Sequence, residues 1–201
     1  MRASRFPTLA TWCRSNQSNS RSRPGPRSSL LLSTEERRHV RLVYRGLALD
    51  RVRSAAASAG LETTLDAAGR TNRNETLRLM KRSQLLLLFS AVDPDPKSFH
   101  RRGLYPGKVF EYFGARRPIL CMPGDDGQLD QLLKETHTGV ICSSREEVSG
   151  FFAEAFTEWQ RAGRLAYQPD EAAVARYERR AQARELASIL DTTTQTSPRH
   201  R

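Results

Sequence analysis

Five consecutive apolar residues, Leu85–Phe89 (LLLLF), form the longest apolar run of the sequence and constrain its fold more than any other feature. A strand with one face in water alternates apolar and polar side chains, but this run is apolar at each position. It therefore predicts a strand with both faces covered, as in parallel sheets with helices on each side. The run is much shorter than the roughly 18 apolar residues that cross a membrane, which argues against an integral membrane protein.

The sequence on either side of this run alternates between strand and helix patterns. Strands are predicted at residues 40–44, 61–67, 84–89, 118–122 and 139–142, and helices at 49–59, 107–114, 129–136, 145–162 and 170–190. A further helix begins at either Asn72 or Asn74, because asparagine is a good N-cap. Alternation in this order predicts the α/β class, with a doubly wound, Rossmann-like parallel sheet.

The positive charge of the chain is concentrated at its ends. The formal net charge is +11, but residues 1–34 hold six arginines and no acid, and residues 198–201 hold two more arginines. Removing these eight charges leaves about +3 for the body, which is ordinary for a globular domain. Because residues 1–34 are polar and lack apolar periodicity, we expect a disordered Arg/Ser-rich segment there. Residues 35–191 are predicted to form the folded domain and residues 192–201 a flexible tail.

Residues 1–34 have three interpretations. A segment rich in arginine and serine and free of acids is typical of an organellar transit peptide. It also fits a non-enzymatic basic module that binds nucleic acid or anionic surfaces, which is the alternative function for this chain. We favour the third interpretation, a misassigned start upstream of a truncated gene. The modest charge of the body predicts no specific nucleic-acid partner and is compatible with a peripheral membrane contact.

The cysteines and acids of the sequence do not form a metal motif. Cys13, Cys121 and Cys142 are an odd number at long spacings, which match neither a zinc site nor a Cys-x-x-Cys redox motif. We expect reduced, buried thiols in a cytoplasmic protein. Asp93 and Asp95 stand beside prolines, a pattern more typical of an Asx turn than of a metal site. The sequence therefore predicts neither a metal ion nor a cofactor.

The candidate site is the segment that begins at Tyr105 (YPGKVFEYF). Pro106 and Gly107 let backbone amides approach a ligand at a helix N-terminus, which favours anions such as phosphate. Lys108 adds an ammonium group, and Glu111 lies on the same helix face one turn later. A carboxylate can accept hydrogen bonds from two neighbouring hydroxyls, so the set suits a nucleoside diphosphate. The alternative is a surface ion pair between Lys108 and Glu111 behind an ordinary helix start.

The segment 105–141, YPGKVFEYFGARRPILCMPGDDGQLDQLLKETHTGVI, resembles the donor-nucleotide half of GT-B glycosyltransferases, particularly family 4. In that family a Pro-Gly-Lys-x-Phe-Glu-Tyr element precedes a small-residue turn and a Pro-Ile-Leu strand. The match extends from about Val40 to Leu190, and Arg45-Gly46 and Gly69-Arg70 fit the pattern upstream. The resemblance implies the single C-terminal half of a GT-B fold.

The resemblance also implies roles for individual residues. Glu111 would bind the ribose hydroxyls of a nucleotide-diphosphate sugar. Lys108 and the amides of Gly107 and Val109 would lie near the diphosphate, and the backbone after the Gly69 turn, at Arg70, would meet the base. Intact relatives transfer a hexosyl or pentosyl group from such a donor to an acceptor hydroxyl, generally without a bound metal.

The sequence departs from the family in two respects. The family has two acids with seven residues between them, and Gly103 stands where the first acid is expected. We therefore assign no catalytic residue. The acceptor-binding half and the opening strand and helix of the donor half are also unmatched, which is why a truncated gene is favoured. We expect a missing lobe to be encoded separately and this chain alone to show no transferase turnover.

Overall fold

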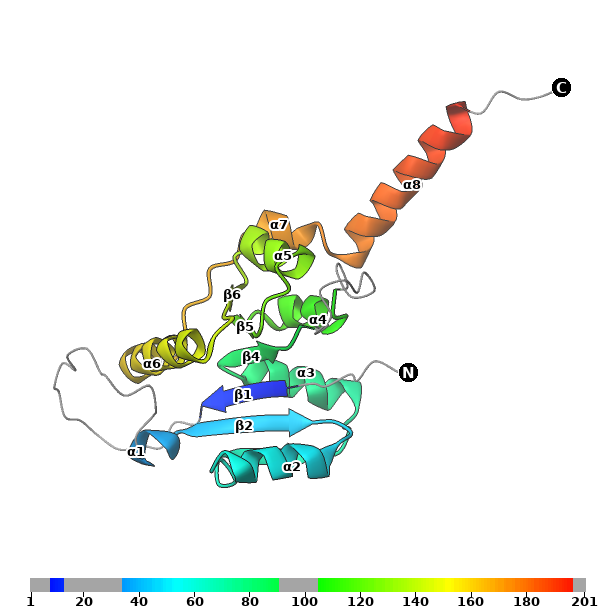
Figure 1. The fold of residues 1–201 in the computed structure, drawn as a ribbon. Helices are drawn as coiled ribbons and strands as arrows, with labels where there is room; N and C mark the ends of the chain where they lie inside the picture. Colours follow the sequence, from blue (N-terminus) through cyan, green and yellow to red (C-terminus); the bar gives the residue numbers. More distant parts are fainter. Residues whose placement is uncertain (1–7, 13–33, 91–104, 197–201) are drawn as a thin grey trace.

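The computed structural model describes residues 8–12, 34–90 and 105–196, and in this part of the chain six strands form one sheet (Figure 1). The strand order is β3-β2-β1-β4-β5-β6. The strands are β1 (Thr8–Trp12), β2 (Val40–Arg45), β3 (Leu65–Ala68), β4 (Leu85–Leu88), β5 (Ile119–Cys121) and β6 (Gly139–Ile141). Strand β2 pairs parallel with β3, and β4, β5 and β6 are parallel to one another. The predicted α/β class with parallel strands is confirmed.

The helices between these strands begin where local sequence signals place them. They are α1 (Thr34–Arg37), α2 (Leu49–Ser58), α3 (Arg73–Arg82), α4 (Lys108–Ala115), α5 (Gln128–Thr136), α6 (Arg145–Ala162), α7 (Glu171–Ala175) and α8 (Arg179–Thr196). Of the two candidate caps of α3, Asn72 is used: its Oδ1 accepts from the Glu75 amide at 2.9 Å. Ser144 caps α6 in the same way, and Gly163 ends it in the left-handed region at φ 71°.

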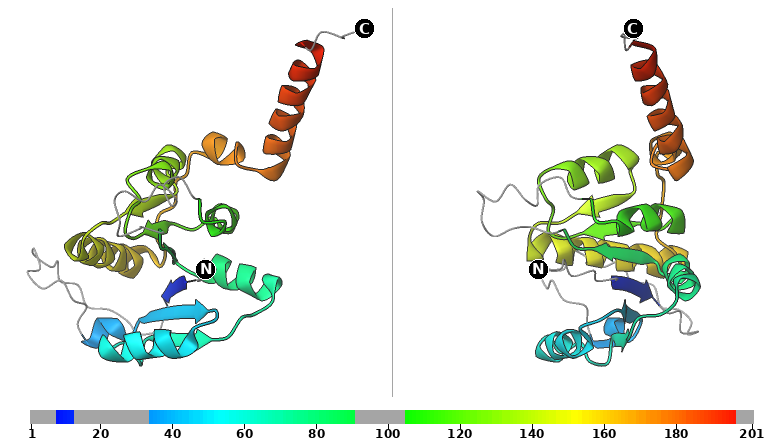
Figure 2. Two further views of the ribbon diagram at one scale, coloured as in Figure 1. Left: turned by 45° about the vertical axis from the view of Figure 1, so that its right-hand side comes forward. Right: turned by 90° about the vertical axis from the view of Figure 1, so that its right-hand side faces the viewer.

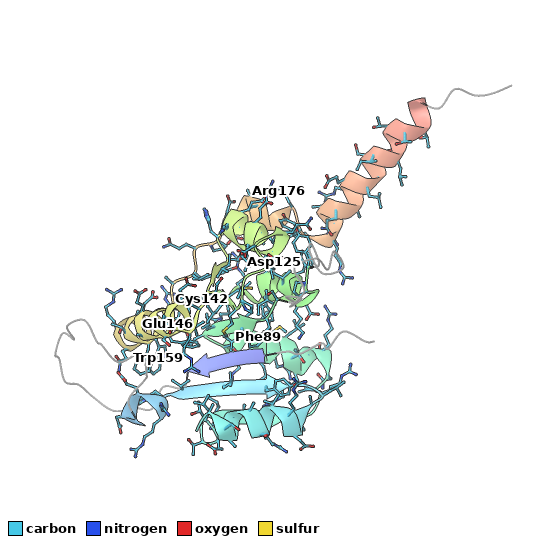
Figure 3. All side chains as sticks on the ribbon, in the orientation of Figure 1. Phe89, Asp125, Cys142, Glu146, Trp159 and Arg176 are labelled. Carbon is cyan, nitrogen blue, oxygen red and sulfur yellow. The ribbon has the colours of Figure 1, made fainter. Side chains whose placement is uncertain are left out.

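Strand β4 is buried on both faces, as its sequence predicts. Leu86 and Leu88 belong to one apolar cluster and Leu85 and Leu87 to another, so successive side chains enter different cores. The first cluster contains side chains of α3, α4 and α5, whereas the second contains Phe156 and Trp159 of α6 (Trp159 is labelled in Figure 3). Helices therefore cover both faces of the sheet (Figure 2).

Strand β1 differs from the prediction that residues 1–34 are disordered. Residues 8–12 pair antiparallel with both β2 and β4, and α1 begins at Thr34. The physical reason is that the facing edges of β2 and β4 carry backbone N–H and C=O groups that need partners, and an extended segment supplies them. Residues 1–7 and 13–33 lie outside the described residues.

Two further boundaries differ from the sequence prediction. Residues 61–64 form a turn before β3 instead of its first half, because the Thr64 and Leu65 amides donate to the Leu61 carbonyl. The predicted helix 170–190 is two helices, interrupted at residues 176–178, and α8 continues to Thr196.

The helical conformation of residues 192–196 corrects the expected flexible tail. The hydroxyls of Thr192, Thr193 and Thr194 donate to carbonyls four residues earlier at 2.8–3.0 Å, which satisfies these polar side chains inside the helix. Residues 197–201 lie outside the described residues. Helix α8 extends away from the sheet in all views (Figures 1 and 2). No helix among the described residues combines the length and apolar character needed to cross a bilayer.

Candidate functional site

A cavity of about 290 Å³ lies at the carboxyl ends of β2 and β3, beside the first turn of α4. Its lining comes from the loop after β2, the turn after β3, helix α3 and helix α4: Arg45, Gly46, Leu47, Arg70, Thr71, Thr76, Met80, Lys108 and Glu111. Three predicted site residues, Arg70, Lys108 and Glu111, therefore line one cavity. The carboxyl ends of strands are where open α/β sheets bind ligands.

Helix α4 presents Lys108 and Glu111 to this cavity because its other side is buried. Val109, Tyr112 and Phe113 belong to the core, and the Tyr112 hydroxyl donates to the Leu87 carbonyl of β4 at 3.1 Å. The core therefore fixes the rotation of α4. Lys108 and Glu111, three residues apart, share the remaining face.

Glu111 forms an ion pair with Arg73, a residue that has no site signal in the sequence. Nη1 of Arg73 lies 3.9 Å from Oε1 of Glu111, and 39% of the Glu111 side chain remains exposed. The ion pair joins α3 to α4 across the cavity wall. Among the described residues, the carboxylate is thus accessible from the cavity and paired with one exposed arginine at the limit of ion-pair distance.

The backbone around α4 agrees only in part with the predicted phosphate contacts. Gly107 is exposed at the N-cap, and Pro106 precedes it at the helix start. The Val109 amide already donates to the Pro106 carbonyl at 2.9 Å, because the chain makes a tight turn into the helix. Within the chain the Val109 amide thus has a backbone partner, and its predicted place near a diphosphate stays a prediction.

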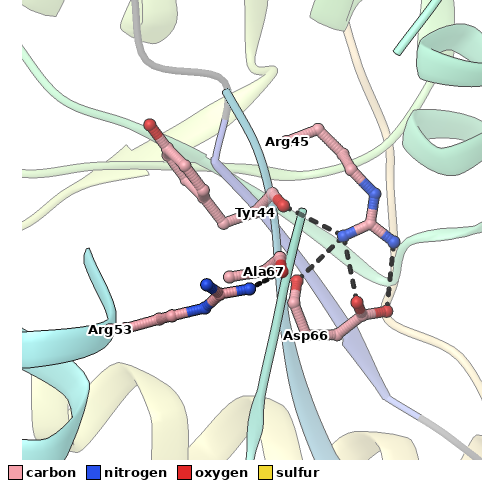
Figure 4. Close-up of polar contacts among 5 residues, drawn as sticks. All are labelled: Tyr44, Arg45, Arg53, Asp66 and Ala67. Carbon is pink, nitrogen blue, oxygen red and sulfur yellow. Dashed lines mark hydrogen bonds and ion pairs between the residues drawn. The ribbon is translucent and has the colours of Figure 1, made fainter. Parts of the chain in front are cut away.

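Arg45 is the most firmly held cation of the cavity (Figure 4). Its Nη1 donates to the carbonyls of Tyr44 and Asp66, each at 2.9 Å, and to Oδ1 of Asp66 at 3.1 Å. Its Nη2 donates to Oδ2 of Asp66 at 3.1 Å, and only 14% of the side chain is exposed. This two-pronged contact ties the ends of β2 and β3 together. No site role was predicted for Arg45, because its partner is 21 residues away on another strand.

Two hydroxyls and a strained loop complete the lining. Oγ1 of Thr71 lies 3.3 Å from Oγ1 of Thr76, and both hydroxyls also donate to the Asn72 carbonyl. After β2, Leu47 is 67% exposed, and the next residue, Ala48, has φ 26°. A positive φ is costly for alanine, and such strain is concentrated at functional sites.

The charge of the lining suits an anion that also carries hydroxyl donors. Arg45, Arg70 and Lys108 are cationic, and Glu111 is the single carboxylate among the described residues that line this cavity. The Asp66 carboxylate offsets the charge of Arg45, so Arg70 and Lys108 remain to attract phosphate groups. A carboxylate, in contrast, can only accept hydrogen bonds at neutral pH. The arrangement is chemically suited to a phosphorylated, hydroxyl-bearing ligand.

The described cysteines are poor candidates for nucleophiles. Burial, together with the negative charges of Asp130 and Asp125, raises the pKa of Cys121 from 9.0 to about 12. Burial also raises the pKa of Cys142, and both thiols are free. Within residues 8–12, 34–90 and 105–196, no group of three histidine, cysteine or acidic side chains is arranged to hold a metal ion. Cys13, Asp93, Asp95 and Gly103 lie outside the described residues.

Comparison with known proteins adds no family assignment. No family model matches this sequence, and no curated protein matches it.

Proposed function

We propose that this chain binds a nucleoside diphosphate sugar in the cavity beside α4, as the donor-binding half of a GT-B-type glycosyltransferase. The observation that carries the proposal is that Arg45 and Arg70, from the strand ends, line the same cavity as Lys108 and Glu111 of α4. The resemblance of residues 105–141 to family 4 supports the same ligand. The strand order is that of a doubly wound sheet apart from the direction of β1, which supports a Rossmann-like architecture.

In this proposal the diphosphate occupies the positive side of the cavity. Lys108 and Arg70 supply charge-assisted hydrogen bonds, and the Gly107 end of α4 contributes the positive end of its dipole. Arg45 holds the ends of β2 and β3 together at the cavity wall, since its guanidinium is already paired with the Asp66 carboxylate.

The ribose lies against Glu111. Its two hydroxyls donate to the two carboxylate oxygens, and this contact replaces the 3.9 Å ion pair with Arg73. The ion pair is exposed and long, so little free energy opposes the exchange.

Gly69 and Gly107, two predicted site residues, stand next to Arg70 and Lys108 of the cavity but do not line it themselves. A Cβ built at either position meets nothing within 4 Å among the described residues, and neither glycine has a positive φ. No contact within the described protein therefore requires glycine at these positions.

Ligand-observed NMR with UDP, GDP and ADP, each beside its 2′,3′-dideoxy counterpart, tests the proposal. We expect at least one nucleotide to bind and its dideoxy form to bind about 10- to 100-fold more weakly, because two hydroxyl bonds to a carboxylate are lost. Glu111→Ala should weaken binding of the parent nucleotide by the same factor, with Glu111→Gln between.

Glu75→Ala is the matched control, because Glu75 is a half-exposed glutamate on α3 that pairs with Arg78 and does not line the cavity. It should leave the affinity unchanged. Equal binding of a nucleotide and its dideoxy form, or unchanged affinity in Glu111→Ala, would return Glu111 to the role of a surface ion-pair partner.

A further inference from the structure

The walls of the cavity come from two different parts of the sheet. Arg45 ends β2, and Arg70 and Thr71 follow β3. Lys108 and Glu111 belong to α4, which is anchored on β4 through Tyr112. A ligand that contacts both walls therefore depends on how the β2–β3 pair is held against the β4–β6 group.

Strand β1 is the strand that joins these two groups. Its residues pair with β2 from Thr8↔Tyr44 to Trp12↔Val40, and with β4 from Thr8↔Leu87 to Ala10↔Leu85. Helix α3 also joins the two groups, because it runs from β3 to β4 along the chain and lines the cavity with Thr76 and Met80. It meets α4 at the Arg73–Glu111 ion pair, and Val43 of β2 shares a core cluster with Leu86 of β4. Without β1, the facing edges of β2 and β4 would lose their hydrogen-bond partners.

The connection of β1 to the domain is much longer than its pairing requires. Trp12 lies opposite Val40, so a hairpin loop of about two to five residues would join β1 to β2. Residues 13–39 stand between them instead. A longer connection costs more closure entropy than a hairpin loop, and the ladder hydrogen bonds of β1 offset this cost.

We propose that insertion of β1 and ligand binding at the cavity are coupled, with β1 acting as a tethered strand that completes the sheet and sets the spacing of the two walls. The inference rests on the proposed function, because the ligand must bridge the walls. Coupling is reciprocal: an inserted strand raises ligand affinity, and a bound ligand favours insertion by the same factor.

The test uses the full chain and the nucleotide found to bind in the experiment above. Ala10→Pro removes a backbone donor from the middle of β1, while Ala10→Ser keeps it and serves as the matched control. We expect Ala10→Pro to lose hydrogen-exchange protection over residues 8–12 and along β2 and β4, and to bind the nucleotide at least about 10-fold more weakly. Ala10→Ser should change neither.

Wild-type protein supplies a second measurement that needs no variant. Saturating nucleotide should slow amide exchange in residues 8–12 more than in α2, which does not line the cavity. If Ala10→Pro does not fold, this measurement on the wild type tests the coupling by itself. Equal slowing of amide exchange in β1 and α2 would overturn the coupling.

The possible failures are distinguishable. A variant Ala10→Pro that loses protection in β1 yet binds with wild-type affinity overturns the coupling and leaves the proposed function standing. Unprotected amides in residues 8–12 of the wild type, with or without nucleotide, also overturn it. Absence of nucleotide binding by the wild type overturns the proposed function and the coupling with it.

Discussion

The Arg73 guanidinium lies 3.9 Å from the Glu111 carboxylate, so the acid that we propose to bind ribose is paired across two helices in the free protein. The side chains are 72% and 39% exposed, which leaves the ion pair screened by solvent. Sequence spacing pointed instead to a partner within α4, at Lys108. The partner on α3 becomes visible only when the two helices are packed together.

The Arg73–Glu111 ion pair should contribute little to folding. Arg73→Ala is expected to change the free energy of unfolding by less than about 1 kcal/mol, because exposed ion pairs are worth roughly 0–1 kcal/mol. Urea denaturation measures this, with Arg78→Ala as the control, since Arg78 is equally exposed and pairs with Glu75 at 3.3 Å. A loss of 2 kcal/mol or more in Arg73→Ala alone would mean that the ion pair holds α3 against α4.

The Arg45–Asp66 contact should contribute more to the free energy of unfolding than the neighbouring Arg53–Ala67 contact. Arg45→Ala is expected to lower the free energy of unfolding by about 2–3 kcal/mol, because a largely buried guanidinium loses several charge-assisted hydrogen bonds. Arg53→Ala is the matched control, since exposed Arg53 makes one 3.3 Å bond to the Ala67 carbonyl of the same strand pair (Figure 4). Equal denaturation midpoints for the two variants would contradict the assignment.

Lys108 should contribute to the affinity for nucleoside diphosphates but not to the affinity for nucleosides. Lys108→Ala is expected to weaken nucleoside diphosphate binding by about 10-fold, because one charge-assisted contact to phosphate is lost. Affinity for the corresponding nucleoside should stay unchanged. Lys134→Ala, which removes an exposed lysine of α5 away from the cavity, controls for net charge in the same titration. An equal loss of affinity for nucleoside and diphosphate would place Lys108 away from the phosphates.

Stability should fall at high pH because of Cys121. Its pKa is raised from 9.0 to about 12 by burial and by Asp130 and Asp125, so above pH 9 the unfolded chain loses a proton that the folded chain keeps. This contribution is fully present below pH 9 and is lost as pH rises toward 12, with a slope of up to about 1.4 kcal/mol per pH unit.

The Cys121 contribution is isolated by comparing wild type with Cys121→Ala. Burial also raises the pKa of Tyr44, Tyr167 and Tyr177. These tyrosines therefore lower stability at high pH too, and they do so equally in both proteins. Urea midpoints between pH 7 and 10.5 should therefore fall more steeply in the wild type. Parallel curves for the two proteins would show that Cys121 ionises equally in both states.

The buried Tyr112 hydroxyl should stabilise the packing of α4 against the sheet. Tyr112→Phe removes the donor to the Leu87 carbonyl and is expected to cost about 1–3 kcal/mol. Tyr105→Phe is the control, because Tyr105 is exposed and its change should stay within about 0.5 kcal/mol. Thermal or urea denaturation of both variants checks the difference, and a neutral Tyr112→Phe would mean that packing alone seats the helix.

Elements with strong local signals were predictable from sequence. The Leu85–Leu88 run forms the doubly buried β4, and α6 spans the predicted residues 145–162. These signals act over a few neighbouring residues, through helix capping and the periodicity of apolar side chains. They can therefore be interpreted without knowledge of the fold. The same holds for Lys108 and Glu111 sharing one face of α4.

Features that depend on residues far apart were missed. The division at residues 176–178 lets the Tyr177 ring pack beside Phe110 and Phe113 of α4, at centroid distances of 6.1 and 6.2 Å. Residues 8–12 form a strand because β2 and β4 leave a place between them in the sheet. The polar sequence on either side of residues 8–12 gives no strand signal. The Val109 amide is used within the chain by the turn that begins α4.

The sequence by itself determined the α/β class, the approximate positions of the helices and strands between β2 and α6, and the grouping of Lys108 with Glu111 on one helix. The tertiary structure decided which charges meet: it paired Glu111 with Arg73, joined Arg45 to Asp66, and placed Arg70 in the same cavity. The physical reason is that side-chain period and capping are properties of adjacent residues. Strand pairing and helix packing, in contrast, bring together groups separated by tens of residues, through burial that only the complete core defines.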